Sequence, residues 1–191
     1  MKLHIHMQLL SDAIFGNGMS MPGGEDICIL TDEKGFPYMK GSTLKGIFRE
    51  ELINYLDWNG NDESSIAQTV GKLMGESGAN QCESRKLTFS DVTLDDRVID
   101  AVCKEGADKQ EVLEMFSYIR EFTRLENGLA REGSLRSSRC IKKGLHFYAS
   151  CICDSQDTEL VESVFRTLKW IGSMRNRGFG KVAIEVEEVN E

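Results

Sequence analysis

The chain has 191 residues, is 40% hydrophobic and carries a formal net charge of −8. This composition suits a globular domain with a real core, and it argues against a protein that coats nucleic acid through bulk positive charge. No apolar run approaches the roughly 20 residues of a membrane span, and the N-terminus alternates like a strand rather than a signal peptide. We therefore expect a cytoplasmic protein that makes no membrane contact.

The first quarter of the chain predicts a strand, a long loop and a helix. Apolar and polar residues alternate over 2–10, which is typical of a strand with one covered face. Residues 11–41 contain both prolines and several glycines, so we expect a loop with a short extended piece at 27–30. Loops of this length inside a compact domain are usually functional. From Ser42 to about Asp57, apolar residues recur at helical spacing.

The rest of the chain repeats strands and helices, although the polar, glycine-bearing residues 59–85 predict no element. In chain order we expect a strand at 86–92, a helix at 109–122, a basic arm or hairpin at 123–143, a strand at 145–153, a helix at 157–171 and a strand at 181–186. This order predicts an α+β fold, a ferredoxin-like or RRM-like antiparallel sheet with helices on one face. We expect a single domain over 1–191, with insertions at about 11–41 and 94–143.

The glycine-rich loop between the last helix and the last strand is the strongest local signal. Gly172, Gly178 and Gly180 allow backbone conformations closed to other residues and would expose amide N–H groups. Arg175 and Arg177 supply planar forks that match phosphate oxygens. The loop therefore suggests RNA or a nucleotide, and the structural alternative is a helix-to-strand connection with solvated arginines.

Charge is segregated along the chain. Residues 120–143 carry seven basic side chains against three acidic ones, and 169–181 carry four basic side chains and no acid. Acidic residues gather in 91–114 and 185–191. This distribution suggests a basic groove on an acidic body, and solvated charged faces are the alternative.

Cysteine and histidine give weaker signals. The six cysteines form no CxxC pair, so buried, reduced thiols are favoured over a zinc ribbon or a disulfide framework. His4 and His6 share one face of the first predicted strand. A histidine-assisted nuclease or a metal site is conceivable there, while exposed or hydrogen-bonded histidines are the simpler interpretation.

Three separated stretches carry a resemblance to a known family. They are Gly35–Gly46, Thr123–Arg136 and the loop Gly172–Gly180. In this order and spacing they resemble the RAMP superfamily of type III CRISPR effector complexes, most closely the repeating backbone subunit of Csm- and Cmr-type assemblies. One departure is Lys40, where the family commonly has proline.

The resemblance gives the start of the first helix a role in RNA binding. Residues 41–46 place a helix N-terminus where Ser42 or Thr43 would cap it, and helix N-termini favour phosphate. Lys45 would reach the same phosphate. In the resembling family this helix start grips the guide RNA backbone, so we assign RNA binding to Ser42, Lys45 and Arg49.

The resemblance also points to Asp26 as the catalytic residue and metal ligand. It lies on the loop where the family's backbone subunits carry an aspartate required for metal-dependent target cleavage at regular intervals. Its carboxylate would hold Mg²⁺ or another divalent cation near the scissile phosphate, or orient the 2′-hydroxyl for in-line attack. Glu25 and Asp32 are rivals if the loop register differs, and a turn-capping Asp26 is the structural alternative.

Two further regions are assigned to RNA. The arm is implied to cross the guide–target duplex, where arginines would pair with phosphate and stack on bases, and Arg124 and Arg131 are the assigned residues. In the glycine-rich loop we assign Arg175, Arg177 and Gly178.

The expected function is that of an RNA-binding backbone subunit that cleaves bound target RNA. The implied partners are guide RNA, target RNA, further copies of the chain in a filament and other type III effector subunits. Two alternatives stay open: a non-catalytic structural RAMP subunit, and a guide-RNA-processing endoribonuclease that acts without metal through His4, His6 or His146.

Overall fold

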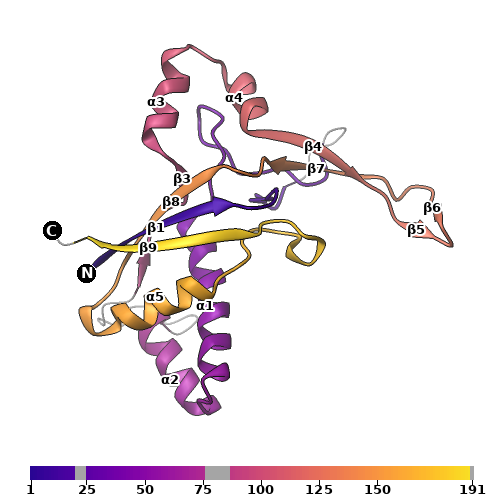
Figure 1. The fold of residues 1–191 in the computed structure, drawn as a ribbon. Coiled ribbons are helices and arrows are strands. Elements are labelled where there is room, and N and C mark those ends of the chain that lie inside the picture. Colours follow the sequence, from indigo (N-terminus) through magenta and orange to yellow (C-terminus); the bar gives the residue numbers. More distant parts are fainter. Residues whose placement is uncertain (20–24, 76–86, 190–191) are drawn as a thin grey trace.

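The computed structural model describes residues 1–19, 25–75 and 87–189 (Figure 1). They form the predicted α+β fold, built on an antiparallel sheet. Within these residues, no helix is both long and apolar enough to cross a membrane.

The central strand of the sheet is β1 (Lys2–Leu9), which pairs antiparallel with β8 (His146–Ile152) on one side and β9 (Val182–Val189) on the other. The short strands β2 (Thr88–Phe89) and β3 (Thr93–Leu94) both pair with β8. The resulting order β2-β8-β1-β9 is that of a ferredoxin-like sheet.

The alternation of β1 explains why one face of the sheet is covered. Leu3, Ile5, Met7 and Leu9 are all buried, at most 1% exposed, whereas His4 on the other face is exposed. The buried side chains enter a core shared with the helices.

Three helices lie on the side of the sheet that β1 buries (Figure 1): α1 (Gly41–Trp58), α2 (Glu63–Met74) and α5 (Thr158–Thr167). The buried residues of α1 recur at three- and four-residue spacing and face the core: Gly41, Leu44, Phe48, Leu52 and Leu56. The rings of Phe48 and Phe165 meet with centroids 4.8 Å apart, which packs α1 against α5.

A second unit lies across β8 from α1, α2 and α5 (Figure 1). Its elements are α3 (Asp96–Lys104), α4 (Lys109–Phe116), β4 (Ser117–Phe122), β5 (Leu125–Glu126), β6 (Leu129–Ala130) and β7 (Arg136–Ile141). β4 and β7 form a two-stranded ribbon, and the small β5–β6 hairpin lies at its far end (Figure 1). We call residues 117–141 the arm; they include most of the stretch 123–143 for which an extended arm or hairpin was predicted, and begin six residues before it.

The predicted helix at 109–122 is wrong in its second half. The helix ends at Phe116, and Ser117–Phe122 continue as β4, paired with β7. Tyr118, Ile119 and Phe122 favour a strand, and the pairing with β7 outweighs the helical signal of the preceding residues.

Two helices were not predicted. In α2 only Val70, Leu73 and Met74 are buried, so the apolar stripe is confined to its last turns. α3 has no fully buried residue.

The predicted strand at 86–92 is interrupted, because only Thr88–Phe89 and Thr93–Leu94 pair with β8. Lys86 and residues 76–85 lie outside the described residues.

The long connection between β1 and α1 is held by single bridges rather than by strands. Ile27 pairs with Ser138 of β7 in parallel, Gly16 pairs with Ile29, and Ala13 pairs with Ile141. The expected extended piece at 27–30 therefore lies beside β7. This contact brings the candidate catalytic loop to the base of the arm.

Candidate nucleic-acid interface

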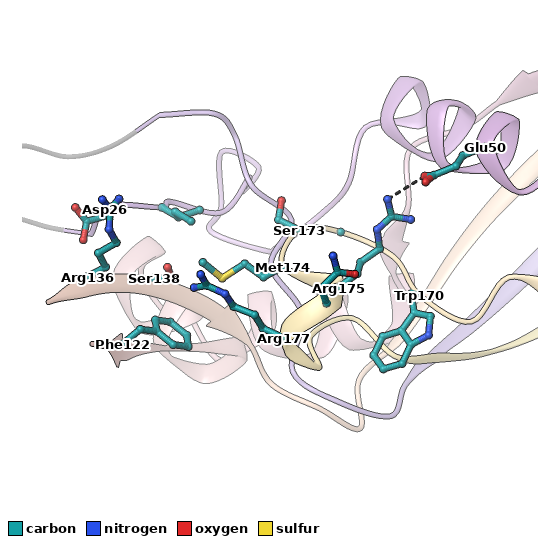
Figure 2. Close-up of a pocket in the computed structure, with 13 residues that line it drawn as sticks. Asp26, Glu50, Phe122, Arg136, Ser138, Trp170, Ser173, Met174, Arg175 and Arg177 are labelled. Atoms are coloured by element: carbon teal, nitrogen blue, oxygen red, sulfur yellow. Dashed lines mark hydrogen bonds and ion pairs between the residues drawn. The ribbon is translucent and has the colours of Figure 1, made fainter. Parts of the chain in front are cut away.

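A groove of about 1290 Å³ opens between the loop that precedes β9, the base of the arm and the segment around Asp26 (Figure 2). Residues distant in sequence line it: Asp26, Ile27, Glu50, Phe122, Arg136, Ser138, Trp170, Gly172, Ser173, Met174, Arg175, Asn176 and Arg177. Of the residues assigned from the sequence, the groove unites Asp26, Arg175 and Arg177.

The glycine-rich loop forms one wall of the groove. A 3₁₀ turn, η2 (Arg175–Arg177), lies between Met174 and Gly178, which both adopt left-handed backbone conformations. Its flanking glycines allow close approach of two backbones, since a Cβ on Gly172 would lie 2.6 Å from the Ile14 oxygen. The loop shape therefore depends on packing against the core.

The expectation that this loop exposes its glycine amides is wrong for two of them. The N–H of Gly180 donates to the carbonyl of Asp12 at 2.7 Å, and the N–H of Gly178 donates to that of Arg175 at 3.1 Å. These amides complete the turn instead of pointing at a ligand. Phosphate recognition by this wall would therefore rest on its arginines.

The two arginines of the loop have different surroundings. Arg175 Nη2 donates to Glu50 Oε2 of α1 at 2.9 Å, and both side chains are well exposed. Arg177 is exposed and makes no ion pair with any described residue. Figure 2 shows Arg177 extending along the groove toward Ser138. Of these two arginines, Arg177 is thus available to a phosphate directly, whereas Arg175 would exchange Glu50 for a phosphate.

Asp26 lies on the opposite wall, next to β7. The N–H of Ser137 donates to Asp26 Oδ2 at 2.7 Å, and the N–H of Asp26 donates to the Ser137 carbonyl at 3.0 Å. The Asp26 side chain is exposed, and among the described residues Oδ1 accepts no hydrogen bond. One carboxylate oxygen is therefore fixed and the other is available to a ligand.

Two aromatic side chains line the groove at separate places (Figure 2). Phe122, at the end of β4, and Trp170, before the glycine-rich loop, both line it and are half-buried. Phe122 packs edge-on against buried Phe179, and the Arg120 guanidinium lies over both rings. Phe122 and Trp170 offer faces on which bases can stack.

Ser138 is an unsatisfied polar group at the groove wall. Ser138 is 1% exposed, and its Oγ is buried with no hydrogen-bond partner among the described residues. Leaving such a hydroxyl unpaired costs about 1–3 kcal/mol.

Asp12 connects the arm to the glycine-rich loop. Tyr118 Oη donates to Asp12 Oδ2 at 2.6 Å, and the N–H of Lys143 donates to Asp12 Oδ1 at 3.0 Å. The hydrogen bond to Asp12, together with burial, raises the pKa of Tyr118. Since the Asp12 carbonyl also accepts from Gly180, this aspartate fixes the base of the arm relative to the loop.

The two rivals of Asp26 have structural partners. Asp32 Oδ1 accepts from the N–H groups of Lys34 and Phe36, both at 2.9 Å, and so closes a turn. Glu25 is only 9% exposed and pairs with Arg139. Neither carboxylate lines the groove, so Asp26 is the residue of the three that reaches it.

The predicted cap of the first helix is wrong. Lys40 occupies the N-cap without a side-chain hydrogen bond, and the N–H of Gly41 donates to Asp91 Oδ1 at 2.7 Å. Gly41 is required there, because a Cβ would lie 2.5 Å from the Phe89 carbonyl oxygen. Ser42 is exposed and Lys45 is half-buried, and neither lines the groove.

The remaining assigned arginines also lie outside the groove. Arg49 Nη1 donates to the Gly75 carbonyl at 3.3 Å, at the end of α2. Arg124 and Arg131 are exposed beside the β5–β6 hairpin, and Arg131 lies 3.9 Å from Glu126. Any RNA that contacts these side chains must extend beyond the groove.

The metal prediction depends on Asp26. Among the described residues, no group of three or more histidine, cysteine or acidic side chains is arranged to hold a metal ion. Asp26 offers one hard oxygen, which fits Mg²⁺ because this ion is commonly held by one or two carboxylates together with substrate phosphates and water. A site of this kind would be completed by the RNA.

His6 and His146 form a cluster with Glu185 on the open face of the sheet. His6 Nε2 and His146 Nδ1 are 2.7 Å apart, and His6 Nδ1 lies 3.2 Å from Glu185 Oε2. The sequence placed His4 and His6 on one face but did not reveal that His146 and Glu185 join His6. None of these side chains lines the groove.

The cysteines largely meet the expectation of buried thiols. Cys28, Cys140, Cys151 and Cys153 are buried and Cys103 is exposed, while Cys82 lies outside the described residues. Burial raises the pKa of Cys140 to about 11 and that of Cys151 to about 12. These two thiols therefore stay protonated near neutral pH.

Sequence reasoning missed most of the groove's uncharged surface. Phe122, Ser138, Trp170 and Met174 line it, and Glu50 pairs with Arg175. Trp170 carried a usable signal, since an aromatic residue adjacent to a basic glycine-rich loop is a candidate stacking platform. Ser138 carried none, because its importance comes from burial without a partner.

Comparison with known proteins gives one family and several structures. The family model described as "RAMPs: RAMP superfamily" matches residues 6–183. No curated protein matches the chain.

The structural matches cover nearly the whole chain. A chain of the cryo-EM structure of the Type III-B Cmr-beta bound to cognate target RNA has a TM-score of 0.69 and 12% identity, with 97% of both chains covered. A chain of the apo Type III-B Cmr-beta structure has a TM-score of 0.70 and 13% identity, with 98% of both covered. A chain of a Type IV-B CRISPR complex has a TM-score of 0.62 and 11% identity, covering 100% of this chain and 92% of its own. At these identities the likeness establishes the fold alone.

Proposed function

The chain belongs to the RAMP superfamily, and from this premise we propose that it is an RNA-binding backbone subunit of a type III CRISPR interference complex that cleaves bound target RNA. The observation that carries the proposal is the exposed Asp26 carboxylate, which shares one groove with Arg177 and two half-buried aromatic residues. The similar chains belong to Type III-B and Type IV-B complexes, one of them bound to target RNA, which supports an effector role.

The groove is suited to bind RNA through phosphates and bases together. Arg177 would pair with a phosphate directly, and Arg175 would do so on leaving Glu50. Phe122 and Trp170 would stack unpaired bases, which the protein can reach where a duplex is interrupted. These contacts recognise backbone and ring faces, so they suit an RNA of any sequence.

In this proposal, Asp26 would act on an RNA backbone held by these contacts. With Oδ2 fixed by the Ser137 N–H, Oδ1 would accept a hydrogen bond from a ribose 2′-hydroxyl and orient it toward the adjacent phosphorus. Attack of the 2′-oxygen on phosphorus would transfer the 2′-hydroxyl proton to Asp26 Oδ1, form a 2′,3′-cyclic phosphate and break the bond from phosphorus to the 5′-oxygen, which would take up a proton from water. A bound Mg²⁺ would polarise the phosphate and stabilise its developing charge. Arg177 would stabilise the same charge from the opposite wall.

The charge distribution supports binding of RNA at the groove. The chain carries a net charge of −8, yet its groove contains three arginines against Asp26 and Glu50. We propose guide RNA, target RNA, further copies in a filament and other type III subunits as partners. Exposed apolar residues of the arm, Leu129 and Leu135, are 75% and 65% exposed and would be covered in such an assembly.

Cleavage by the reconstituted complex tests this proposal. A target RNA complementary to the guide is incubated with Mg²⁺ or EDTA, using wild type, Asp26→Ala and the control Asp100→Ala, whose carboxylate is exposed on α3. We expect regularly spaced cuts with wild type and Asp100→Ala, and none with EDTA or Asp26→Ala. A 2′-deoxy nucleotide at one cut site should abolish that cut alone.

A structural subunit is the second candidate. It is favoured by the fact that Asp26 is the only carboxylate other than Glu50 among the described groove residues. Intact target RNA in the presence of Mg²⁺, together with tight guide binding by wild type, would establish this role and reject the nuclease.

The histidine cluster keeps a third candidate open. Because His6 and His146 are in hydrogen-bond contact and Glu185 lies beside them, they could exchange protons in metal-independent processing of guide RNA. Cleavage of repeat RNA that persists in EDTA and is lost in His6→Ala would favour this function.

A further inference from the structure

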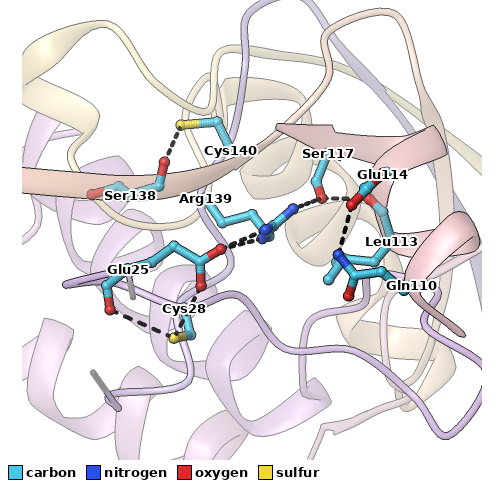
Figure 3. Close-up of polar contacts among 9 residues, drawn as sticks. All are labelled: Glu25, Cys28, Gln110, Leu113, Glu114, Ser117, Ser138, Arg139 and Cys140. Atoms are coloured by element: carbon cyan, nitrogen blue, oxygen red, sulfur yellow. Dashed lines mark hydrogen bonds and ion pairs between the residues drawn. The ribbon is translucent and has the colours of Figure 1, made fainter. Parts of the chain in front are cut away.

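A buried ion pair lies directly beside the candidate catalytic residue. Arg139 of β7 and Glu25 are 8% and 9% exposed. Arg139 Nε donates to Glu25 Oε1 at 2.8 Å, and Nη2 donates to the same oxygen (Figure 3). These residues are 114 positions apart in sequence, so the pair closes a long-range contact.

Both partners are further satisfied inside the protein. Arg139 Nη1 donates to Ser117 Oγ at 3.3 Å, and that hydroxyl donates to the Leu113 carbonyl of α4. The Cys28 thiol approaches Glu25 Oε2 at 3.7 Å. Figure 3 shows these contacts as one chain of interactions that crosses from the Glu25 segment through β7 to α4. The network therefore ties Glu25 to the arm and not to the groove.

The backbone next to the pair carries Asp26. Asp26 exchanges hydrogen bonds with Ser137, and the N–H of Arg139 donates to the Ile27 carbonyl at 3.1 Å. Asp26 lies at a bend, with the Glu25 side chain buried and the Asp26 side chain exposed. Glu25 consequently points into the protein while Asp26 points into the groove.

We propose that Glu25 and Arg139 are positioning residues, which set the register of this segment on β7 and so hold Asp26 in the groove. A slip by one residue along β7 would take Asp26 away from the Ser137 amide and leave Arg139 without its two-nitrogen contact to Glu25. A buried arginine without a partner is strongly disfavoured, so the pair selects one register. The relevance of this positioning to cleavage rests on the proposed function.

The register is measured by hydrogen exchange at the Ser137 amide, because its acceptor is Asp26 Oδ2. Three chains are compared in the assembled complex: wild type, Glu25→Gln and the double variant Glu25→Met with Arg139→Met, which fills similar volume without charge. Glu33→Gln, an exposed glutamate on the same connection, is the control. Target binding and single-turnover cleavage are measured on the same samples.

For Glu25→Gln we expect exchange at Ser137 to speed up and the cleavage rate to fall, each by about tenfold or more, with target affinity changed by less than about twofold. The double variant should recover the melting temperature of wild type but neither the slow exchange nor the cleavage rate. Glu33→Gln should match wild type throughout.

Two results would overturn the proposal. Wild-type exchange at Ser137 in Glu25→Gln would show that the pair does not set the register. If the double variant recovers both the slow exchange at Ser137 and the stability of wild type, filling the volume of the two side chains is enough to set the register and the ion pair is not required. If wild type itself leaves target RNA intact while Glu25→Gln still speeds exchange, the nuclease function fails and the positioning role stands.

Discussion

The two walls of the groove are each braced by an arginine–glutamate pair, but the pairs differ in burial. The side chains of Arg139 and Glu25, behind the Asp26 wall, are 10% and 11% exposed, whereas those of Arg175 and Glu50, at the glycine-loop wall, are 38% and 57% exposed. A buried pair is costly to break because it leaves an uncompensated charge, while an exposed pair contributes about 0–1 kcal/mol.

This difference separates a fixed wall from an adjustable one. If Asp26 acts on a phosphodiester as proposed, it must keep a defined position, and its neighbour Glu25 is held by the buried pair with Arg139. Arg175 is held loosely enough to exchange a carboxylate for a phosphate. What fixes the glycine-loop wall is backbone packing, since Gly172 and Gly180 approach the backbone of Ile14 and Ile171.

The largest effect on the free energy of unfolding is expected from Gly180→Ala, which disrupts that backbone packing. A Cβ at this position would lie 1.8 Å from the Ile171 carbonyl oxygen, and the φ of +76° is already unfavourable for alanine. We expect a loss of about 4 kcal/mol or more, or failure to fold. Gly178→Ala is the matched control, because its Cβ would meet no described atom within 4 Å, and its positive φ alone should cost about 1–2 kcal/mol. Equal losses in denaturant unfolding would contradict this.

Next in size is the contrast between the two ion pairs themselves. Arg139→Ala should lower the free energy of unfolding by about 3–5 kcal/mol, because Glu25 is left buried and unpaired. Glu50→Ala should change it by less than about 1 kcal/mol. Urea denaturation of both variants measures the difference, and similar values would remove the distinction between the walls.

RNA affinity should depend on the unpaired arginine of the adjustable wall. Arg177→Ala should weaken RNA binding by the assembled complex about tenfold, through loss of one charged contact to phosphate. The slope of log affinity against log salt should decrease by about 0.7 for a single-stranded contact. Arg97→Ala, an exposed arginine paired with Asp95 outside the groove, is the control. An unchanged affinity in Arg177→Ala would place RNA elsewhere.

The smallest effect is expected from Glu50→Gln. Removing this carboxylate frees Arg175 for phosphate, so RNA should bind about two- to threefold tighter at low salt. The gain should disappear as salt screens the exposed pair. Weaker binding would show instead that Glu50 holds Arg175 in the orientation that RNA needs.

The sequence predicted the elements whose pattern is local. The alternation of residues 2–10 predicted β1, and the apolar spacing after Ser42 predicted α1. The glycine-rich loop also stands where it was expected, because left-handed backbone at Gly172 and Gly180 is a local requirement. α2 was missed because its buried residues are confined to its end, and β4 was mistaken for helix because its pairing with β7 is long-range.

Which residues make up the site was harder to predict, because its contacts join residues that are far apart in sequence. Nothing in the sequence indicates that Glu25 is buried against Arg139, 114 positions away, or that Asp26 meets the Ser137 amide. Arg124 and Arg139 lie in the same basic stretch of the sequence, 120–143, yet Arg139 is buried, whereas Arg124 is exposed on the arm. Burial and pairing distinguish these roles, and both arise from tertiary contacts.

Single-turnover cleavage by Asp26→Asn is the most direct test of Asp26 as the residue that cuts RNA. The asparagine side chain keeps an oxygen that can accept from the Ser137 N–H, so the segment should stay in place while the negative charge is lost. If Asp26 acts as proposed, target cleavage in the reconstituted complex should slow by about 100-fold or more with unchanged target affinity. Cleavage at the wild-type rate would contradict it.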